Sequence, residues 1–136
     1  MSSLSVTHDT GDQFSVAVRG HVLHVDQPVV DGGADTAPTP VELFVASLAT
    51  CVGHYAHRYL KRHQLTTTGL AVTAHWDLTT SPNRVGEIQI ELTIPEGVPA
   101  ERQAALLAVA SHCTVHNSLA SPPAVTVVAA AQASAA

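Results

Sequence analysis

One stretch decides the fold: TPVELFVASLATCVGHYAHRYLKRH, residues 39–63. Thr39 suits the N-cap of a helix, Pro40 suits its first turn, and Glu42 completes a Thr-x-x-Glu capping box. Up to Cys51 the residues are apolar almost all round the helix, which is typical of a buried helix rather than a surface helix with one apolar stripe. We therefore predict one long, largely buried helix, which carries the first of the chain's two cysteines.

The length of this helix constrains the rest of the fold. At roughly 1.5 Å per residue it spans ~36 Å, close to the diameter of so small a domain. A thin sheet from the same chain would not cover it, so we infer that a second subunit contributes to its burial. Beyond Cys51 the helix becomes basic, and Arg58, Lys61 and Arg62 complement the negative end of the helix dipole.

Composition limits the function classes. With 136 residues the chain is large enough for one domain with a substantial core, residues 1–136, whose end at about 129–136 we expect to be a flexible tail of small residues. The net charge of −5, with only six Lys plus Arg, argues against nucleic acid or an anionic membrane surface as partner. There is no uncharged apolar run of about 20 residues and no basic-then-apolar leader. We therefore expect a cytoplasmic protein.

Alternating apolar residues predict strands on both sides of the helix. Three short strands precede it as a meander, and a hairpin follows it, before a second helix that starts at Pro99 and reaches about His112-Cys113. A last strand follows Pro122-Pro123, with Val125 and Val127 on one face. This order predicts an α+β fold in which two helices pack on a mostly antiparallel sheet. The other predicted strands cover about residues 3–8, 14–18, 21–25, 70–77 and 87–94.

The two cysteines, Cys51 and Cys113, lie 62 residues apart. The residues alone leave three interpretations open: buried structural thiols, a redox pair, or metal ligands acting with nearby histidines. A static disulfide is the least expected state because the cytoplasm is reducing. Free cysteine is among the most buried residue types, so plain buried thiols are a strong alternative to any chemistry.

Histidines near the cysteines define the metal alternative. His54 follows Cys51 by three residues, and His116 follows Cys113 by three. On a helix this spacing places both groups on one face, and a Cys₂His₂ set could hold Zn²⁺ tetrahedrally. The competing interpretation is that these imidazoles line the thiol pocket or are simply solvated. Two further histidines, His57 and His112, lie close by in the sequence.

Two motifs carry a family resemblance. The first is Pro40-x-Glu42-Leu43-Phe44 followed by Ser47-Leu48-Ala49-Thr50-Cys51, after the loop Gly32-Gly33-x-Asp35. The second is Cys113-Thr114-Val115-His116-Asn117-Ser118-Leu119, followed by Pro122 and a Val-rich segment. Together they resemble the OsmC/Ohr family over about residues 14–128. The resemblance implies an OsmC-like intertwined homodimer, in which two long central helices pack together and sheets from both chains surround them.

The resemblance also implies a thiol peroxidase that protects against oxidative stress. In this family the first cysteine, here Cys51, attacks an organic hydroperoxide and becomes a sulfenic acid. The second, here Cys113, resolves it to a disulfide that a dithiol reduces, without a cofactor or a metal. The alternatives are a protein that binds a small apolar or thiol ligand between subunits with little turnover, and a structural zinc site. The expected substrate pocket contains Phe44, Leu48, His54, Tyr55 and His116.

Two positions depart from the family's peroxidases, which have an arginine in the N-terminal region and an acid directly after the motif proline. Arg19 corresponds only approximately to that arginine, and Val41 stands where the acid would be. Glu42 follows one place later, about 180° round the helix from Cys51, so capping explains it without catalysis. The usual relay that activates the thiol is therefore weakened, and a protonated His54 would be its substitute. Weaker candidates for stabilising the thiolate are Arg58 and Arg84.

Overall fold

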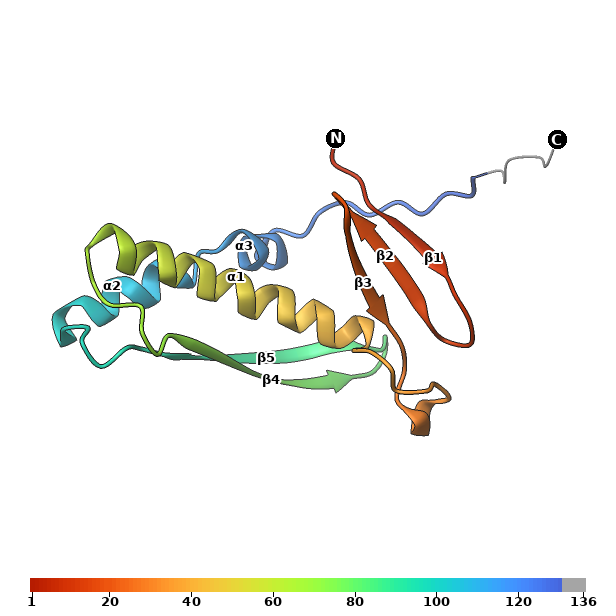
Figure 1. The fold of residues 1–136 in the computed structure, drawn as a ribbon, viewed down its shortest axis with the longest axis horizontal. Coiled ribbons are helices and arrows are strands. Elements are labelled where there is room, and N and C mark those ends of the chain that lie inside the picture. Colours follow the sequence, from red (N-terminus) through yellow and green to blue (C-terminus); the bar gives the residue numbers. More distant parts are fainter. Residues whose placement is uncertain (131–136) are drawn as a thin grey trace.

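The computed structural model describes residues 1–130, which form an α+β fold (Figure 1). The predicted fold class is therefore confirmed, while most of the predicted tail, at 131–136, lies outside the described residues. None of the helices within residues 1–130 is long and apolar enough to cross a membrane. In chain order the elements are β1 (Ser5–His8), β2 (Phe14–Val18), β3 (His21–Val25), the 3₁₀ turn η1 (Val29–Asp31), α1 (Pro40–Arg62), β4 (Ala71–Thr79), β5 (Arg84–Thr93), α2 (Ala100–Ala110) and α3 (Thr114–Ala120).

The long helix α1 begins as the sequence predicts. The Oγ1 of Thr39 accepts a hydrogen bond of 3.1 Å from the backbone N–H of Glu42, and the Glu42 carboxylate accepts one of 2.8 Å from the N–H of Thr39. This capping box satisfies two N–H groups that the start of a helix leaves without intrahelical partners. At the other end, Lys61 and Arg62 lie in the last turn, where their charges complement the helix dipole.

The main core lies between α1 and the β4–β5 hairpin, and α2 and α3 pack against α1 (Figure 1). In the hairpin, Val72 pairs with Leu92 and Ala74 with Ile90. Because side chains alternate along a strand, these four lie on one face, and Ile90 and Leu92 pack against the core. The buried members of the core are Leu48, Val52, Ala56, Tyr59, Leu60, Val98, Leu106, Ala110 and Cys113.

The first three strands form a separate antiparallel sheet in the order β1-β2-β3. In Figure 1 this sheet extends away from the N-terminal end of α1, and it makes few contacts with the other described elements. Apolar side chains on the sheet are consequently exposed, among them Val6 (55%), Val22 (59%) and Leu23 (49%). Sheets in stable domains bury at least one face, so this sheet lacks its second layer within a single chain.

A buried carboxylate organises the loop between β3 and α1. Asp26 is 1% exposed, and its carboxylate accepts hydrogen bonds from the backbone N–H groups of Gln27 and Thr36 and from the Thr36 hydroxyl. The Thr36 N–H contributes most to a pKa of Asp26 that lies below its ordinary value. Gly33 packs so closely that a Cβ there would collide with the carbonyl of Gln27. The tight Gly32-Gly33 turn predicted from the sequence is therefore needed for close packing as well as for conformational freedom.

The C-terminal part of the predicted fold is wrong in two respects. The sequence predicts no helix between the second helix and the last strand, but a third helix, α3, follows Cys113. Residues 121–130 form no strand, and Val125 and Val127 are 81% and 92% exposed.

The predicted single sheet is also wrong within residues 1–130, since the strands form a three-stranded and a two-stranded sheet.

Within a single chain, the start of α1 is less buried than the sequence predicts. Val45 and Leu48 are buried at 2% and 6% exposure, on the side of the helix that faces the core. One turn earlier on the same side of the helix, Val41 (37%) and Phe44 (41%) remain open to solvent, because the described chain covers the start of α1 less completely. The start of the helix therefore keeps apolar side chains that the described chain does not cover.

Candidate active site

The fold brings the two cysteines together. Cys51 lies in the middle of α1 and is partly exposed, whereas Cys113 is the N-cap of α3 and has no exposed surface. Cys51 packs against the buried cluster that contains Cys113. Both thiols are free, so two groups 62 residues apart in the sequence become neighbours in the core.

The surroundings of Cys113 favour its protonated form. Burial raises the pKa of the Cys113 thiol, and its interaction with the Cys51 side chain raises that pKa further. The backbone N–H of His116 opposes the shift by donating to the Cys113 sulfur over 3.4 Å. The net direction is upward, so at neutral pH Cys113 is a thiol and not a thiolate.

A hydrogen bond between side chains holds α3 against α1 beside the cysteines. The hydroxyl of Tyr55, one turn after Cys51, lies 2.8 Å from the Oγ1 of Thr114, the residue after Cys113. His54 is exposed and sets its ring edge-on to that of Tyr55, with 5.8 Å between ring centroids. The Tyr55 hydroxyl of α1 therefore contacts the first residue of α3 and fixes the start of this helix, which follows the second thiol.

Two open, mostly apolar cavities lie between α1, β5 and the C-terminal helices. One has a volume of about 260 Å³ and the other about 400 Å³. Leu48, Ile88 and His116 line both, so the cavities adjoin. Phe44 lines the larger one. Of the predicted pocket residues, Phe44, Leu48 and His116 therefore line cavity walls, whereas His54 and Tyr55 do not line either of these two cavities.

The cavity walls include residues that the sequence interpretation did not assign to the site. Ile88, Ile90 and Leu92 come from one face of β5, and Leu107 comes from α2. The alternation of β5 marks its apolar residues as core-facing, but no signal in the sequence tells a core side chain from one that lines a cavity. Their place beside Leu48 emerges only when β5 packs beneath α1.

Arg19 lies in the N-terminal sheet and not next to α1 in the sequence. It forms, with Gly20, the two-residue turn between β2 and β3, and both residues have positive φ, 48° and 81°. This geometry is that of a tight type I′ hairpin. The turn belongs to the separate N-terminal sheet, and within residues 1–130 no hydrogen bond or ion pair joins Arg19 to Cys51.

Glu42 and Arg84, two other charged residues considered for activating the thiol, form hydrogen bonds that stabilise a helix start and a turn. Glu42 is engaged in the capping box with Thr39. Arg84 donates from Nη1 to the carbonyls of Thr80 and Pro82, and so stabilises the turn of the β4–β5 hairpin. Val41, in the position of the family's acid, lines a third cavity of about 390 Å³ together with Arg84.

The zinc interpretation has no geometric support within one chain. Among residues 1–130 no group of three or more His, Cys, Asp or Glu side chains is gathered closely enough to hold a metal ion. The imidazole of His112 instead lies 2.7 Å from the carbonyl of Ala108, one turn earlier in the chain.

Comparisons with solved structures agree with the fold described above. A comparison with curated proteins finds no match. Among solved structures, one from Psychrobacter arcticus, provisionally described as an osmotic stress induced and detoxification response protein, superposes with a TM-score of 0.80 at 22% identity, over 87% of this chain and 88% of that one. An OsmC-like protein from Mycoplasma pneumoniae gives 0.77 at 15% identity, over 90% and 89%. An organic hydroperoxide resistance protein from Elizabethkingia anophelis gives 0.66 at 23% identity, over 87% and 88%.

At these identities the solved structures establish a shared fold. The family assignment rests on the sequence, because the family model described as OsmC-like protein matches residues 32–128. That range contains both cysteines, α1 and the cavity walls. The chain therefore belongs to the OsmC-like protein family.

Proposed function

We propose that this protein is a thiol peroxidase that reduces organic hydroperoxides through Cys51 and Cys113. The observation that carries the proposal is the pairing of a partly exposed thiol with a buried one, in a core cluster whose member Leu48 lines two apolar cavities, although neither cysteine lines them. A solved relative in fold is an organic hydroperoxide resistance protein, which supports the same substrate class. Apolar walls favour a peroxide with a hydrocarbon group over hydrogen peroxide.

Burial assigns the roles of the two cysteines. The attacking group must be a thiolate that a substrate can reach. Cys113 is fully buried and its pKa is raised, so it fails on both counts. Cys51 is partly exposed and becomes the nucleophile.

The chemistry then balances in three steps. The Cys51 thiolate attacks the outer oxygen of the hydroperoxide, the O–O bond breaks, and the alkoxide leaves as the alcohol after taking a proton. Cys51 is now a sulfenic acid. The Cys113 sulfur attacks the Cys51 sulfur, a disulfide forms and water leaves. An external dithiol reduces this disulfide with two electrons and returns both thiols.

We further propose that the working unit is a homodimer. Val41 and Phe44 at the start of α1 and the apolar side chains of the N-terminal sheet are all exposed, and Figure 1 shows this sheet apart from the β4–β5 hairpin. Packing the sheet of one subunit on the helix of the other would bury both. In this arrangement Arg19, on the turn of that sheet, would serve the Cys51 of the partner subunit.

Peroxide consumption by the purified protein tests the function. With dithiothreitol as reductant, we expect cumene hydroperoxide to be consumed faster than hydrogen peroxide, and Cys51→Ser to abolish the reaction. Cys113→Ser should retain one turnover and accumulate a sulfenic acid that dimedone traps at Cys51. Consumption no faster than that of Cys51→Ser would reject the peroxidase and favour a ligand-binding role, for which Val41 in place of the family's acid is the supporting observation.

A sedimentation measurement tests the dimer separately. We expect a species of twice the 14.1 kDa chain mass. Phe44→Glu places a charge on an exposed apolar side chain at the start of α1, which also lines the larger cavity, and should shift the population towards monomer. A monomeric parent protein would reject the homodimer and leave the arrangement of Arg19 unsupported.

A further inference from the structure

Positive charge is concentrated at one end of an acidic protein. Four of the chain's six Lys and Arg residues lie at the C-terminal end of α1 and the start of α2, and all four are exposed. Residues 43–76 contain no Asp or Glu at all, although the whole chain has a net charge of −5. We call the four residues Arg58, Lys61, Arg62 and Arg102 the basic end.

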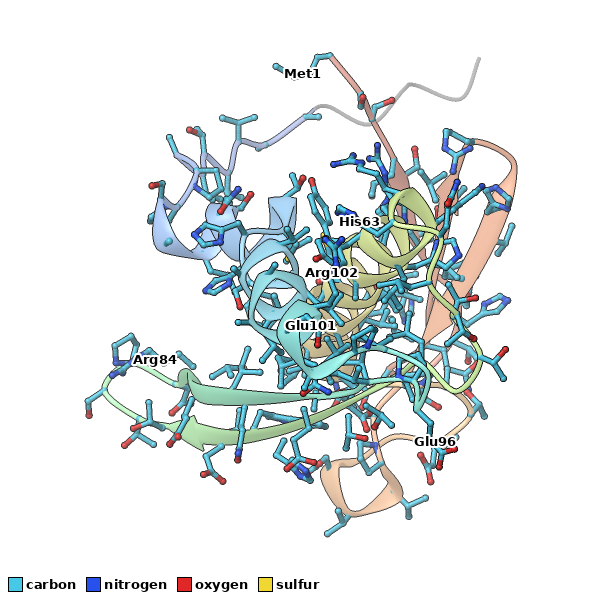
Figure 2. All side chains as sticks on the ribbon, turned by 90° about the vertical axis from the view of Figure 1, so that its left-hand side faces the viewer. Met1, His63, Arg84, Glu96, Glu101 and Arg102 are labelled. Atoms are coloured by element: carbon cyan, nitrogen blue, oxygen red, sulfur yellow. The ribbon has the colours of Figure 1, made fainter. Side chains whose placement is uncertain are left out.

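The cations of the basic end lack acidic partners. Within residues 1–130 only one basic and one acidic side chain lie within ion-pair distance, His75 and Glu91 on the hairpin, with 3.7 Å between Nε2 and Oε1. Arg102 instead lies with its Nη1 3.4 Å from the Nδ1 of His63, so a second basic side chain is its neighbour. Figure 2 looks onto this end of the molecule and shows His63 and Arg102 close together, with Glu101 below them.

Helix electrostatics explain only part of this cluster. Lys61 and Arg62 suit the last turn of α1, where the helix dipole is negative. Arg102 lies in the first turn of α2, where the dipole disfavours a cation. Arg58 lies before the last turn of α1. A purely structural origin therefore leaves two of the four cations unexplained.

The basic end adjoins the reactive thiol along the surface of α1. Arg58 follows Cys51 by seven residues, which places it on the same helix face about 10 Å further along. His54 lies between them, and both His54 and Arg58 are exposed. A continuous exposed ridge thus runs from the accessible cysteine to the cluster of cations.

We propose that the basic end is the docking surface for an acidic protein that delivers the reducing dithiol to Cys51. This proposal rests on the proposed peroxidase function, which leaves a disulfide to be reduced. Four cations spread over two helices match an extended acidic surface better than a single small anion, and such complementarity speeds encounter. Cys51 is the sulfur that a partner can reach, because Cys113 has no exposed surface.

The transfer is an ordinary thiol–disulfide exchange. A thiolate of the partner attacks the Cys51 sulfur, the bond between the two cysteines breaks, and Cys113 leaves and takes up a proton. The second thiolate of the partner then attacks the mixed disulfide. Cys51 is released as a thiolate, and the partner departs as an internal disulfide with two electrons fewer.

Two synthetic peptides test the docking surface. Both carry a Cys-x-x-Cys dithiol, flanked by six Glu residues in one and six Gln residues in the other. The disulfide of the full-length protein is formed with diamide, so the reduction step is measured whether or not peroxide is a substrate. We expect the Glu peptide to reduce it about tenfold faster at low ionic strength, and its advantage to vanish at about 0.5 M salt.

The difference in rate between the two peptides shows whether the basic end or the net charge of the whole protein governs the encounter. A protein with net charge −5 should repel the Glu peptide, so equal or slower reduction than with the Gln peptide would overturn the proposal. Acceleration by the small dianionic dithiol dimercaptosuccinate, without acceleration by the Glu peptide, would also overturn it. That result would indicate a binding site for a small anion.

Matched variants locate the effect. Lys61→Gln, Arg62→Gln and Arg102→Gln should each reduce the preference for the Glu peptide and leave reduction by uncharged dithiothreitol unchanged. Gln89→Glu on the exposed side of β5 changes the net charge by the same amount and in the same direction. If Gln89→Glu reduces the preference as much as the three variants do, the docking surface is rejected. Failure of the peroxidase assay does not affect this test, because the disulfide is formed with diamide.

Discussion

The hydroxyl of Tyr55 lies 2.8 Å from the Oγ1 of Thr114, and this contact joins the middle of the long helix to the residue after Cys113. Tyr55 is one turn from Cys51 on α1, and Thr114 is the first residue of α3. The hydrogen bond therefore connects the two elements that supply the thiols. It holds the second sulfur in reach of the first by positioning helices, without touching either sulfur.

Removing this bond should loosen the second thiol. We expect Tyr55→Phe to lower the free energy of unfolding by about 0.5–1.5 kcal/mol and to slow closure of the Cys51–Cys113 disulfide after oxidation. Urea denaturation and the rate of thiol loss measure the two effects. Thr114→Val should behave alike, and the double variant should cost little more than either single one. Fully additive losses would show that the two side chains do not act together.

Tyr59 should respond in the opposite sense, although it lies on the same helix. It is 6% exposed, and its buried hydroxyl has no hydrogen-bond partner among residues 1–130. An unpaired buried hydroxyl costs about 1–3 kcal/mol, so Tyr59→Phe should leave the stability unchanged or raise it. Thermal unfolding beside Tyr55→Phe provides the comparison. A loss as large as that of Tyr55→Phe would mean that the Tyr59 hydroxyl has a partner beyond the described chain.

The buried Cys113 thiol should make the protein sensitive to alkali. Its folded pKa lies above the unfolded value of about 8.5. The contribution of the neutral thiol is therefore complete below that unfolded pKa and is lost as the pH rises through the folded one. We expect stability to fall from about pH 8.5 upward, and Cys113→Ala to reduce this slope in denaturation curves. Cys51→Ser should keep most of the slope, since burial is the main cause of the shift.

Asp26 should make the protein sensitive to acid. Its folded pKa is lowered, chiefly by the N–H of Thr36, so its stabilising contribution is present above the unfolded pKa of about 3.9. That contribution is lost as the pH falls through the folded value. We expect Asp26→Asn to be less stable at pH 7 and to lose less stability on acidification. Denaturation between pH 2 and about pH 7 tests this, and a parallel pH profile for variant and parent would contradict the role of the carboxylate.

The part of the fold that the sequence could predict is the part with local signals. Thr39 and Glu42 specify the start of α1 by themselves, and the alternation around Ile88 and Ile90 marks β5 as a half-buried strand. These elements need only neighbours in the chain to be recognised. The nearness of Cys51 to Cys113 came instead from the family resemblance, because nothing in their spacing requires it.

Two features escaped because their causes are not local. The segment Thr114–Ala120 is rich in Thr, Val, His, Asn and Ser, which are poor helix formers, and Cys113 is an unusual N-cap. Packing on α1 and the Tyr55 contact stabilise this helix, and neither can be seen in its own residues. Conversely, Val125 and Val127 alternate like a strand, but a strand exists only when another strand offers its edge, and none within residues 1–130 does so.

The unequal burial of the two thiols gives the protein an internal reporter. In the reduced, folded state only Cys51 is open to a maleimide dye, so labelling attaches one fluorophore per chain at a known place on α1. After unfolding, Cys113 reacts as well and the count doubles. The ratio of dye to protein therefore measures the folded fraction. The single dye on the folded protein also reports on the surface around Cys51, where substrate and reductant would bind.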